Sequence, residues 1–326
     1  MSYQNNNIIE SQMLPPRISL PLGEKRGKAF ISFASAGCGD PDLLTIKAAK
    51  VLQQAEVVLT DRLVSKEILD RYVKYSATIV YVGKQAYKEG STKQATINEL
   101  LVQYAQLGKK IVRLKGGDSS IFGNILDELE TVTKHNIPFE IIPGVTAALG
   151  AAAYGGIPLT ARNYANAVRF LTYWKKDAIS ENYWNELAQT DDTLVFYMSS
   201  EVLPEVVFHL TKNNISPEKK LAIIEQATTP QQQITISDLY DFEKNGLENK
   251  IFASPTLIII GKVVALQERF KWFLEGESKK EREKESKREG ERKREGESKI
   301  EGESKKEREK ESVLKERKEC YFKEIS

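Results

Sequence analysis

Two glycines followed by an aspartate are the residues of this sequence that point most directly to chemistry. They come after Lys115, where the apolar run of residues 111–114 ends. The apolar run suits a buried strand, and adjacent glycines allow positive φ angles and a close approach of the backbone to a ligand. The carboxylate of Asp118, beside Gly116 and Gly117, could bind or orient a small molecule, although a tight turn alone would also account for these residues.

Polar or turn residues follow three other strand-like segments in the same way. Cys38, Asp61 and Lys84 each come shortly after a short apolar segment. Such segments alternate with helical patterns, which indicates a mostly parallel sheet, and ligands bind beyond the carboxyl ends of parallel strands. We therefore expect these three residues and Asp118 to share one site.

The segments that would position these residues indicate an α/β fold. In the first half, the sequence predicts strands at 30–34, 56–60, 78–82, 111–114 and 139–142, and helices at 44–55, 97–105 and 124–135. In the second half, it predicts strands at 167–172, 193–198, 221–224, 233–236 and 256–264, and helices at 177–187 and 202–211. We therefore predict two α/β domains, residues 28–143 and 144–270, with a cleft where they meet, preceded by a flexible leader over residues 1–27.

The last part of the chain has a different composition. From about Glu275 it consists mostly of Lys, Glu, Arg, Ser and Gly, and residues 275–286 are identical to residues 301–312. A segment with so little apolar surface cannot offset the entropy lost on ordering. We expect residues 275–326 to form a charged low-complexity tail without chemistry. Because Glu nearly balances Lys and Arg, and the net charge is +2, no nucleic-acid partner is expected.

Cysteine content and hydropathy favour a cytoplasmic protein. Cys38 and Cys320 lie far apart in the sequence, which argues against a disulfide framework and fits a reducing compartment. The longest apolar stretch, residues 257–266, is interrupted by Lys262 and falls short of the roughly 18 residues of a membrane span. Residues 1–27 lack the apolar core of a signal peptide. We therefore expect no membrane partner.

The ordered motifs of residues 30–266 resemble those of the tetrapyrrole methylase family, and within it the uroporphyrinogen-III C-methyltransferases. The motifs that carry the resemblance lie at residues 35–45, 61–65, 82–84, 97–98, 113–118, 121–123, 143–148, 156–160, 197–198 and 259–264. The chain has no G-x-G-x-x-G fingerprint that opens a helix after a strand. The resemblance implies two α/β domains that bind S-adenosylmethionine in the cleft between them, and a homodimer.

The resemblance also implies a reaction and the residues that perform it. Methyl groups would pass one after another to ring carbons of uroporphyrinogen III, without a metal ion, giving precorrin-2 on the route to sirohaem and cobalamin. Asp61 corresponds to the family's proton acceptor and Lys84 to its proton donor, although the residues alone also fit a turn aspartate and a surface lysine. The cofactor contacts correspond to Cys38, Gly116, Gly117, Asp118, Ile121, Thr146, Ala147, Met198 and Ala227.

Basic side chains should meet this substrate, because it carries carboxylates around its rim. The candidates are Arg62, Arg113, Lys115 and Arg162. Guanidinium groups pair with carboxylates through two parallel hydrogen bonds, which favours arginine for this role. Each of the four could instead be a solvated charge, and Arg113 and Lys115 are the preferred candidates.

The sequence departs from the family pattern at several motif positions. Cys38 stands where proline is usual, Ser119 and Ser120 replace Pro-Phe, and Ala161 lies where Thr-His-Arg is typical. These departures leave open a reduced activity or another substrate. Two alternatives follow: a methyltransferase of the same fold that acts on a later corrin intermediate, and a catalytically weakened cofactor-binding protein.

Overall fold

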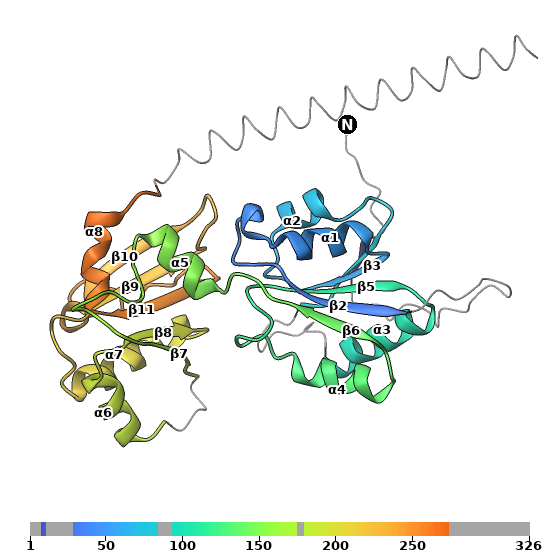
Figure 1. The fold of residues 1–326 in the computed structure, drawn as a ribbon. Helices are drawn as coiled ribbons and strands as arrows, with labels where there is room; N and C mark the ends of the chain where they lie inside the picture. The colour runs from blue at the N-terminus through green and yellow to red at the C-terminus, as the bar shows by residue number, and fades with distance from the viewer. Residues whose placement is uncertain (1–7, 11–28, 84–92, 175–178, 274–326) are drawn as a thin grey trace, which may run out of the picture. The chain divides into compact units, whose positions relative to one another are not determined.

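Two β-sheets with helices packed against them organise the residues that the computed structural model describes (Figure 1). These residues are 8–10, 29–83, 93–174 and 179–273. Lys84, the predicted tail and most of the predicted leader lie outside them. The described residues up to Phe273 belong to one compact unit, so the division into domains at residues 143 and 144 stays a prediction.

The first sheet is parallel, as the alternation of strands and helices predicts. Its strands are β1 (Ile8–Glu10), β2 (Phe30–Ser35), β3 (Val57–Thr60), β4 (Thr78–Tyr81), β5 (Lys110–Lys115) and β6 (Phe139–Ile142). They lie in the order β1-β4-β3-β5-β2-β6, and each neighbouring pair is parallel. The loops that follow β2, β3, β5 and β6 therefore leave the sheet at the same edge.

Helices cover both faces of this sheet (Figure 1). They are α1 (Ile46–Gln54) and α2 (Lys66–Tyr72) on one face, and α3 (Gln94–Gln106) and α4 (Leu126–Lys134) on the other. Val57 and Leu59 of β3 enter the apolar cluster under α3 and α4, whereas Val58 enters the cluster under α1 and α2. This burial on both faces is typical of a strand inside a parallel sheet.

Strand β1 lies within the segment predicted to be a leader. It runs parallel to β4, with Ile8 opposite Ile79 and Glu10 opposite Tyr81. Pairing with β1 satisfies backbone groups of β4 that would otherwise lie at the edge of the sheet. Residues 8–10 are thus part of the first sheet.

The second sheet is mixed. Its strands are β7 (Val168–Thr172), β8 (Thr193–Tyr197), β9 (Lys220–Glu225), β10 (Gln233–Asp238) and β11 (Thr256–Gly261), in the order β10-β9-β11-β8-β7. Strands β7 and β8 are parallel, and the other neighbouring pairs are antiparallel. The strand predicted at 256–264 ends at Gly261, because the chain turns into the 3-10 helix η4 (Lys262–Leu266). Val263 and Val264 of η4 remain in the core, so the apolar pattern continues past the end of the strand.

Helices also pack on both faces of the second sheet. On one face lie α6 (Glu181–Gln189) and α7 (Leu203–Lys212). Trp184 of α6 is buried in the apolar cluster that these helices form with the sheet. On the other face lies α5 (Ala147–Gly155), and its small buried residues Ala148, Gly150 and Ala151 allow it to approach the sheet closely. The remaining short elements are α8 (Gln267–Phe270), η1 (Pro41–Leu43), η2 (Ser200–Val202) and η3 (Leu239–Asp241).

Candidate functional site

A cavity of about 740 Å³ collects residues from loops of both sheets. Four of the nine predicted cofactor positions line it, namely Cys38, Ala147, Met198 and Ala227. Arg62, a predicted substrate contact, lines it as well, next to residues 247–252 and 254–257. The volume lies within the range of roughly 300–1,000 Å³ that is usual for small-molecule sites. The cavity is therefore the candidate ligand site.

The Gly-Gly turn after β5 lies against the loop that follows β2. Gly37 and Gly117 exchange two backbone hydrogen bonds, with N···O distances of 3.0 and 2.7 Å. Both have positive φ angles, 76° and 67°, which glycine adopts without steric cost. A methyl group added at Gly117 would meet no atom within 4 Å, whereas one added at Gly116 would lie 3.0 Å from the Leu63 side chain. The backbone at Gly117 is thus open to a ligand.

The carboxylate of Asp118 joins two loops. Its Oδ1 accepts a hydrogen bond from the backbone N–H of Ser120 at 2.8 Å, and its Oδ2 accepts one from the N–H of Gly144 at 2.9 Å. The buried side chain therefore ties the turn after β5 to the loop that leads into α5. Next to it, the buried Ser119 has its hydroxyl 3.2 Å from that of Ser35. Positioning of the loop thus accounts for the geometry of Asp118, and cofactor contact by this residue stays a prediction.

Tyr197, at the end of β8, holds the start of α5. Its hydroxyl lies 2.8 Å from Thr146 Oγ1 and accepts a hydrogen bond from the N–H of Ala148 at 3.1 Å. The Phe122 ring packs on the Tyr197 ring with 5.0 Å between centroids. Burial raises the pKa of the Tyr197 hydroxyl. The sequence motif contained Tyr197 but assigned it no role, although it directly precedes the predicted cofactor contact Met198.

Three residues at the cavity or beside it adopt positive φ angles, which residues other than glycine rarely do. The φ angles are 54° at Met198, 48° at Gln226 and 66° at Thr228. Gln226 and Thr228 flank Ala227 in the sequence. The Met198 side chain is 56% exposed although it is apolar. Such backbone conformations persist where the surrounding structure enforces them and concentrate at functional sites.

Cys38 is half-buried against α5. A methyl group added at Gly150 would come within 2.1 Å of the Cys38 sulfur, so glycine makes room for the thiol. Burial raises the pKa of the thiol, which keeps it protonated at neutral pH. Two contacts anchor the same loop: the Asp40 N–H donates to Thr228 Oγ1 at 3.0 Å, and the Tyr154 hydroxyl donates to Asp40 Oδ2 at 2.7 Å.

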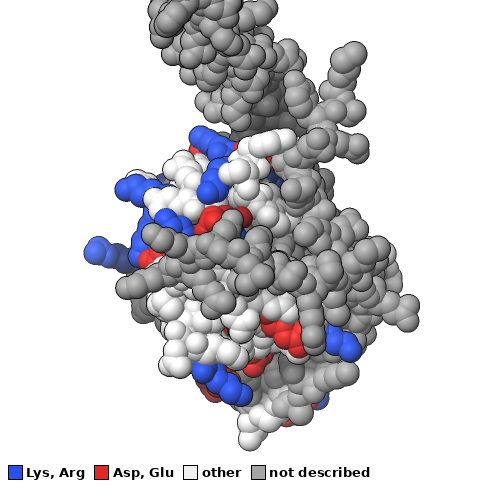
Figure 2. All heavy atoms as spheres, turned by 90° about the vertical axis from the view of Figure 1, so that its right-hand side faces the viewer, with Lys and Arg blue, Asp and Glu red and all other residues white. Residues whose placement is uncertain are grey.

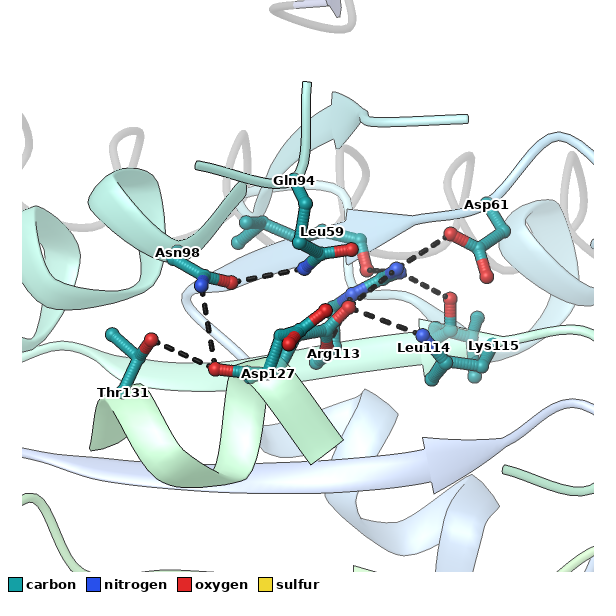
Figure 3. A network of polar contacts seen from close by, with 10 residues as sticks. Leu59, Asp61, Gln94, Asn98, Arg113, Leu114, Lys115, Asp127 and Thr131 are labelled. Atoms are coloured by element: carbon teal, nitrogen blue, oxygen red, sulfur yellow. Dashed lines mark hydrogen bonds and ion pairs between the residues drawn. The ribbon is translucent and has the colours of Figure 1, made fainter. Parts of the chain in front are cut away.

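Asp61, the predicted proton acceptor, is paired with Arg113 (Figure 3). Arg113 Nη2 donates to Asp61 Oδ1 at 2.6 Å. The Asp61 side chain keeps 26% of its surface exposed, whereas that of Arg113 keeps 2%. Asp61 follows β3 and Arg113 lies on the neighbouring strand β5, so the pair forms at the shared edge where the sequence predicted a site.

Arg113 and Lys115 lie in a buried ion-pair network instead of at a substrate surface. Both pair with Glu128 of α4, at 3.1 Å from Arg113 Nε and from Lys115 Nζ. Burial of Glu128 by itself raises the pKa of its carboxyl, but the two cations outweigh this effect and hold the pKa below its ordinary value. Substrate contact by Arg113 or Lys115 is not supported by this placement, because it would require breaking buried pairs. Sequence reasoning missed Glu128.

The remaining predicted residues lie in different surroundings. Arg162 is exposed and is not among the residues that line the cavity. Ile121 packs against the apolar cluster under α5. Ala161 exchanges backbone hydrogen bonds with Ala165. Lys84, the predicted proton donor, lies outside the described residues.

Charges of both signs occur on the face that Figure 2 shows, where Lys and Arg lie among Asp, Glu and uncharged side chains. Within the described ranges, no group of three or more His, Cys, Asp and Glu side chains is arranged to hold a metal ion. None of the described helices combines the length and the apolar character that crossing a bilayer requires.

Comparison with known proteins finds similarity to tetrapyrrole methylases, to siroheme synthases and to methyltransferases of known structure. The family model of Tetrapyrrole (Corrin/Porphyrin) Methylases matches residues 31–243. A siroheme synthase of Vesicomyosocius okutanii is 41% identical over 273 residues, which are 84% of this chain and 55% of that protein. A siroheme synthase of Pseudomonas fluorescens strain Pf0-1 is 45% identical over 243 residues, 74% of this chain and 52% of that protein. The chain thus spans about half the length of the curated relatives it matches.

Solved structures share the fold. The uroporphyrin-III C-methyl transferase of Thermus thermophilus, in complex with S-adenyl homocysteine, is 31% identical with a TM-score of 0.60, covering 72% of this chain and 99% of that one. A cobalt precorrin-4 methyltransferase has a TM-score of 0.64 over 75% of this chain and 99% of that one. At 24% identity, the second likeness shows a common fold alone.

Proposed function

The chain belongs to the tetrapyrrole methylase family, and we propose that it transfers methyl groups from S-adenosylmethionine to ring carbons of uroporphyrinogen III. Precorrin-2, a precursor of siroheme and cobalamin, would be the product. The observation that carries the proposal is the cavity, which brings together four cofactor positions that the family motifs predict. Similarity to a uroporphyrin-III C-methyl transferase solved with S-adenyl homocysteine supports the same conclusion.

The residues around the cavity fit S-adenosylmethionine. The small side chains of Ala147 and Ala227 line the cavity and leave room beside the exposed Met198. Outside the cavity lining, the position that a methyl group at Gly117 would take has no atom within 4 Å. A backbone that a ligand can approach this closely is what the Gly-Gly turn offers. The bound cofactor supplies a methyl group that is already activated on a sulfonium. The chain must chiefly hold that group in line with the ring carbon, which is a proximity effect.

Proton movement falls to residues of the first sheet. When the new carbon–carbon bond forms, the macrocycle must release a proton as it rearranges, and Asp61 is our candidate acceptor. One of its oxygens is held by Arg113, and a quarter of the side chain remains exposed. Lys84 is the candidate donor by its place in the motif.

Carboxylates of the substrate require cations at the cavity. Arg62 and Lys250 are the basic residues among those that line it. Lys250 lies over the Phe252 ring and 3.6 Å from Glu225. We therefore assign substrate contact to Arg62 and Lys250, in place of the buried Arg113 and Lys115.

The same proposal includes a homodimer in the cytoplasm. The family resemblance supports the dimer, and the cysteine content supports the compartment. Light scattering coupled to size-exclusion chromatography tests the first point. A mass near twice the 36.8 kDa of one chain supports it, and a mass near that of one chain contradicts it.

The decisive experiment is anaerobic incubation of the purified chain with uroporphyrinogen III and S-adenosylmethionine labelled in the methyl group. We expect label in the tetrapyrrole, and in Asp61→Asn a turnover that is lowered by about 10²–10⁴-fold but still measurable, with S-adenosylhomocysteine binding intact by calorimetry. Transfer to a later corrin intermediate but not to uroporphyrinogen III would overturn the substrate assignment. Cofactor binding without transfer to either compound would overturn the catalytic proposal.

A further inference from the structure

Glu128 is a fully buried carboxylate whose surroundings are organised around it. It lies in the first turn of α4, and its side chain is 1% exposed. Its Oε2 accepts from Arg113 Nε at 3.1 Å, while Oε1 accepts from Arg113 Nη2 at 3.2 Å and from Lys115 Nζ at 3.1 Å. Both oxygens are therefore used, and Arg113 is held in the two-pronged geometry that fixes a guanidinium plane.

The rest of the Arg113 guanidinium is also satisfied. Besides the bonds to Glu128, Nη2 donates to Asp61 Oδ1 at 2.6 Å (Figure 3). Nη1 donates to the backbone carbonyls of Leu59 at 3.4 Å and Leu114 at 3.2 Å. Five N–H groups thus meet five acceptors, which is the full donor capacity of arginine. Rotation of the guanidinium would leave buried donors without partners, and that is costly.

The fixed guanidinium determines how Asp61 is presented. Asp61 Oδ1 is bonded to Arg113, whereas Oδ2 has no hydrogen-bond partner among the described residues. The next two residues along the chain, Arg62 and Leu63, line the cavity. The network therefore leaves one defined carboxylate oxygen of Asp61 unpaired, immediately before the segment that borders the candidate ligand site.

We infer that Glu128 is a positioning residue for methyl transfer: it locks Arg113, and Arg113 in turn orients Asp61 so that Oδ2 can accept the substrate proton. This inference rests on the proposed function. Glu128 does not line the cavity, so it acts through Arg113 and not by contact with a ligand. The charges of Arg113 and Lys115 balance those of Asp61 and Glu128, so the network keeps Asp61 in place without a net buried charge.

The test is a double-mutant cycle of Glu128→Gln and Asp61→Asn. Glutamine has the shape of glutamate, but its amide nitrogen must face one of the Arg113 or Lys115 donors, so the lock is lost. Glu128→Gln should lower kcat by about tenfold or more with KM and S-adenosylhomocysteine affinity within about twofold, as expected for an effect confined to the reacting group. In the Asp61→Asn background the same change should lower kcat by less than about twofold, because Glu128 then has nothing left to orient.

Matched variants separate this role from a structural one. Asp192→Asn removes a carboxylate that lies 2.6 Å from Arg169 Nε of β7, away from the cavity, and we expect kcat to be unchanged. If Glu128→Gln fails to fold, Glu128→Asp is carried through the same cycle, since it keeps the charge and withdraws the carboxylate from Arg113. Equal effects of the Glu128 change with and without Asp61 overturn the inference alone. A wild-type chain that methylates no tetrapyrrole overturns the proposed function together with it.

Discussion

Two arginines, one in each sheet, form the same kind of cluster, but the first arginine is buried and the second is partly exposed. Arg113 of β5 pairs with Asp61 and Glu128, and Arg169 of β7 pairs with Glu186 and Asp192. The Arg113 side chain is 2% exposed, whereas that of Arg169 is 30% exposed. An arginine that loses buried carboxylate partners leaves an uncompensated charge in the protein interior, while an exposed pair exchanges its partners for water.

The position of each cluster along its strand explains this difference. Arg113 lies near the carboxyl end of β5, three residues before the first glycine of the Gly-Gly turn. Arg169 lies near the amino end of β7, opposite Leu194, whereas Tyr197 and the cavity lie at the other end of β8. The arginine at the edge that carries the site is therefore buried, and the arginine at the other edge is partly exposed. The comparison suggests that burial of Arg113 serves the site.

Replacing each arginine by methionine should give the largest difference in the free energy of unfolding. Arg113→Met leaves Asp61 and the buried Glu128 without their partner, and should lower the free energy of unfolding by about 3–5 kcal/mol. Arg169→Met should lower it by at most about 1 kcal/mol. Urea denaturation of both variants without ligand measures the difference. Equal losses would show that burial does not distinguish the two clusters.

Acid should remove the contribution of the Glu128 carboxylate to the stability of the fold. Its folded-state pKa lies below the ordinary value of 4.5, because the charges of Arg113 and Lys115 outweigh the effect of burial. A carboxyl with a lowered folded pKa stabilises the fold above its unfolded pKa, and loses this effect as pH falls through the folded value. At neutral pH, Glu128→Gln should cost about 2 kcal/mol. We expect this cost to shrink as unfolding is followed below pH 4.5, and a cost independent of pH would contradict the pairing.

The sequence predicted every described strand except β1. It did not predict this buried network. Alternating strands and helices predicted a parallel first sheet, and the residues at its edge follow from that topology. In β5, Arg113 and Lys115 alternate with apolar residues. A strand with one face in solvent has the same pattern. Their partner Glu128 lies on another element, and only the packing of α4 on the sheet brings it to them.

One signal in the sequence could have identified Glu128. It precedes Val132 by four residues, and residues four apart share a helix face. Val132 is an apolar residue of the predicted helix and is buried in the cluster under α3 and α4, so Glu128 lies on the face of α4 that packs against the sheet, where a carboxylate needs a partner. Helix α2 was not predicted for a similar reason, because its few apolar residues, Ile68 and Leu69, form too short a pattern after the capping Ser65.

Tyr197 extends the comparison to the second sheet, where a neutral hydroxyl holds the start of α5 beside the cavity. Tyr197→Phe removes the hydroxyl that bonds Thr146 and accepts from the Ala148 N–H, and should cost about 1–2 kcal/mol. Because these bonds hold the start of α5 beside the cavity, S-adenosylhomocysteine affinity should fall as well. Tyr240→Phe removes one hydroxyl bond, to the carbonyl of Ile215, away from the cavity. It serves as the control, and equal loss of ligand affinity in both variants would contradict the role of Tyr197.

Salt should lower the stability contribution of the Arg169 cluster and leave that of the Arg113 cluster unchanged, and this is the smallest effect we predict. Asp192→Asn weakens the exposed cluster and should cost less than about 1 kcal/mol at low ionic strength. At about 1 M salt the Debye length is near 3 Å, so exposed pairs are screened and this cost should vanish. Buried pairs are screened far less, and the cost of Glu128→Gln should persist in the same series of unfolding measurements. If salt removed both costs alike, water and ions would have access to the Arg113 cluster, and its burial could not be what fixes Asp61.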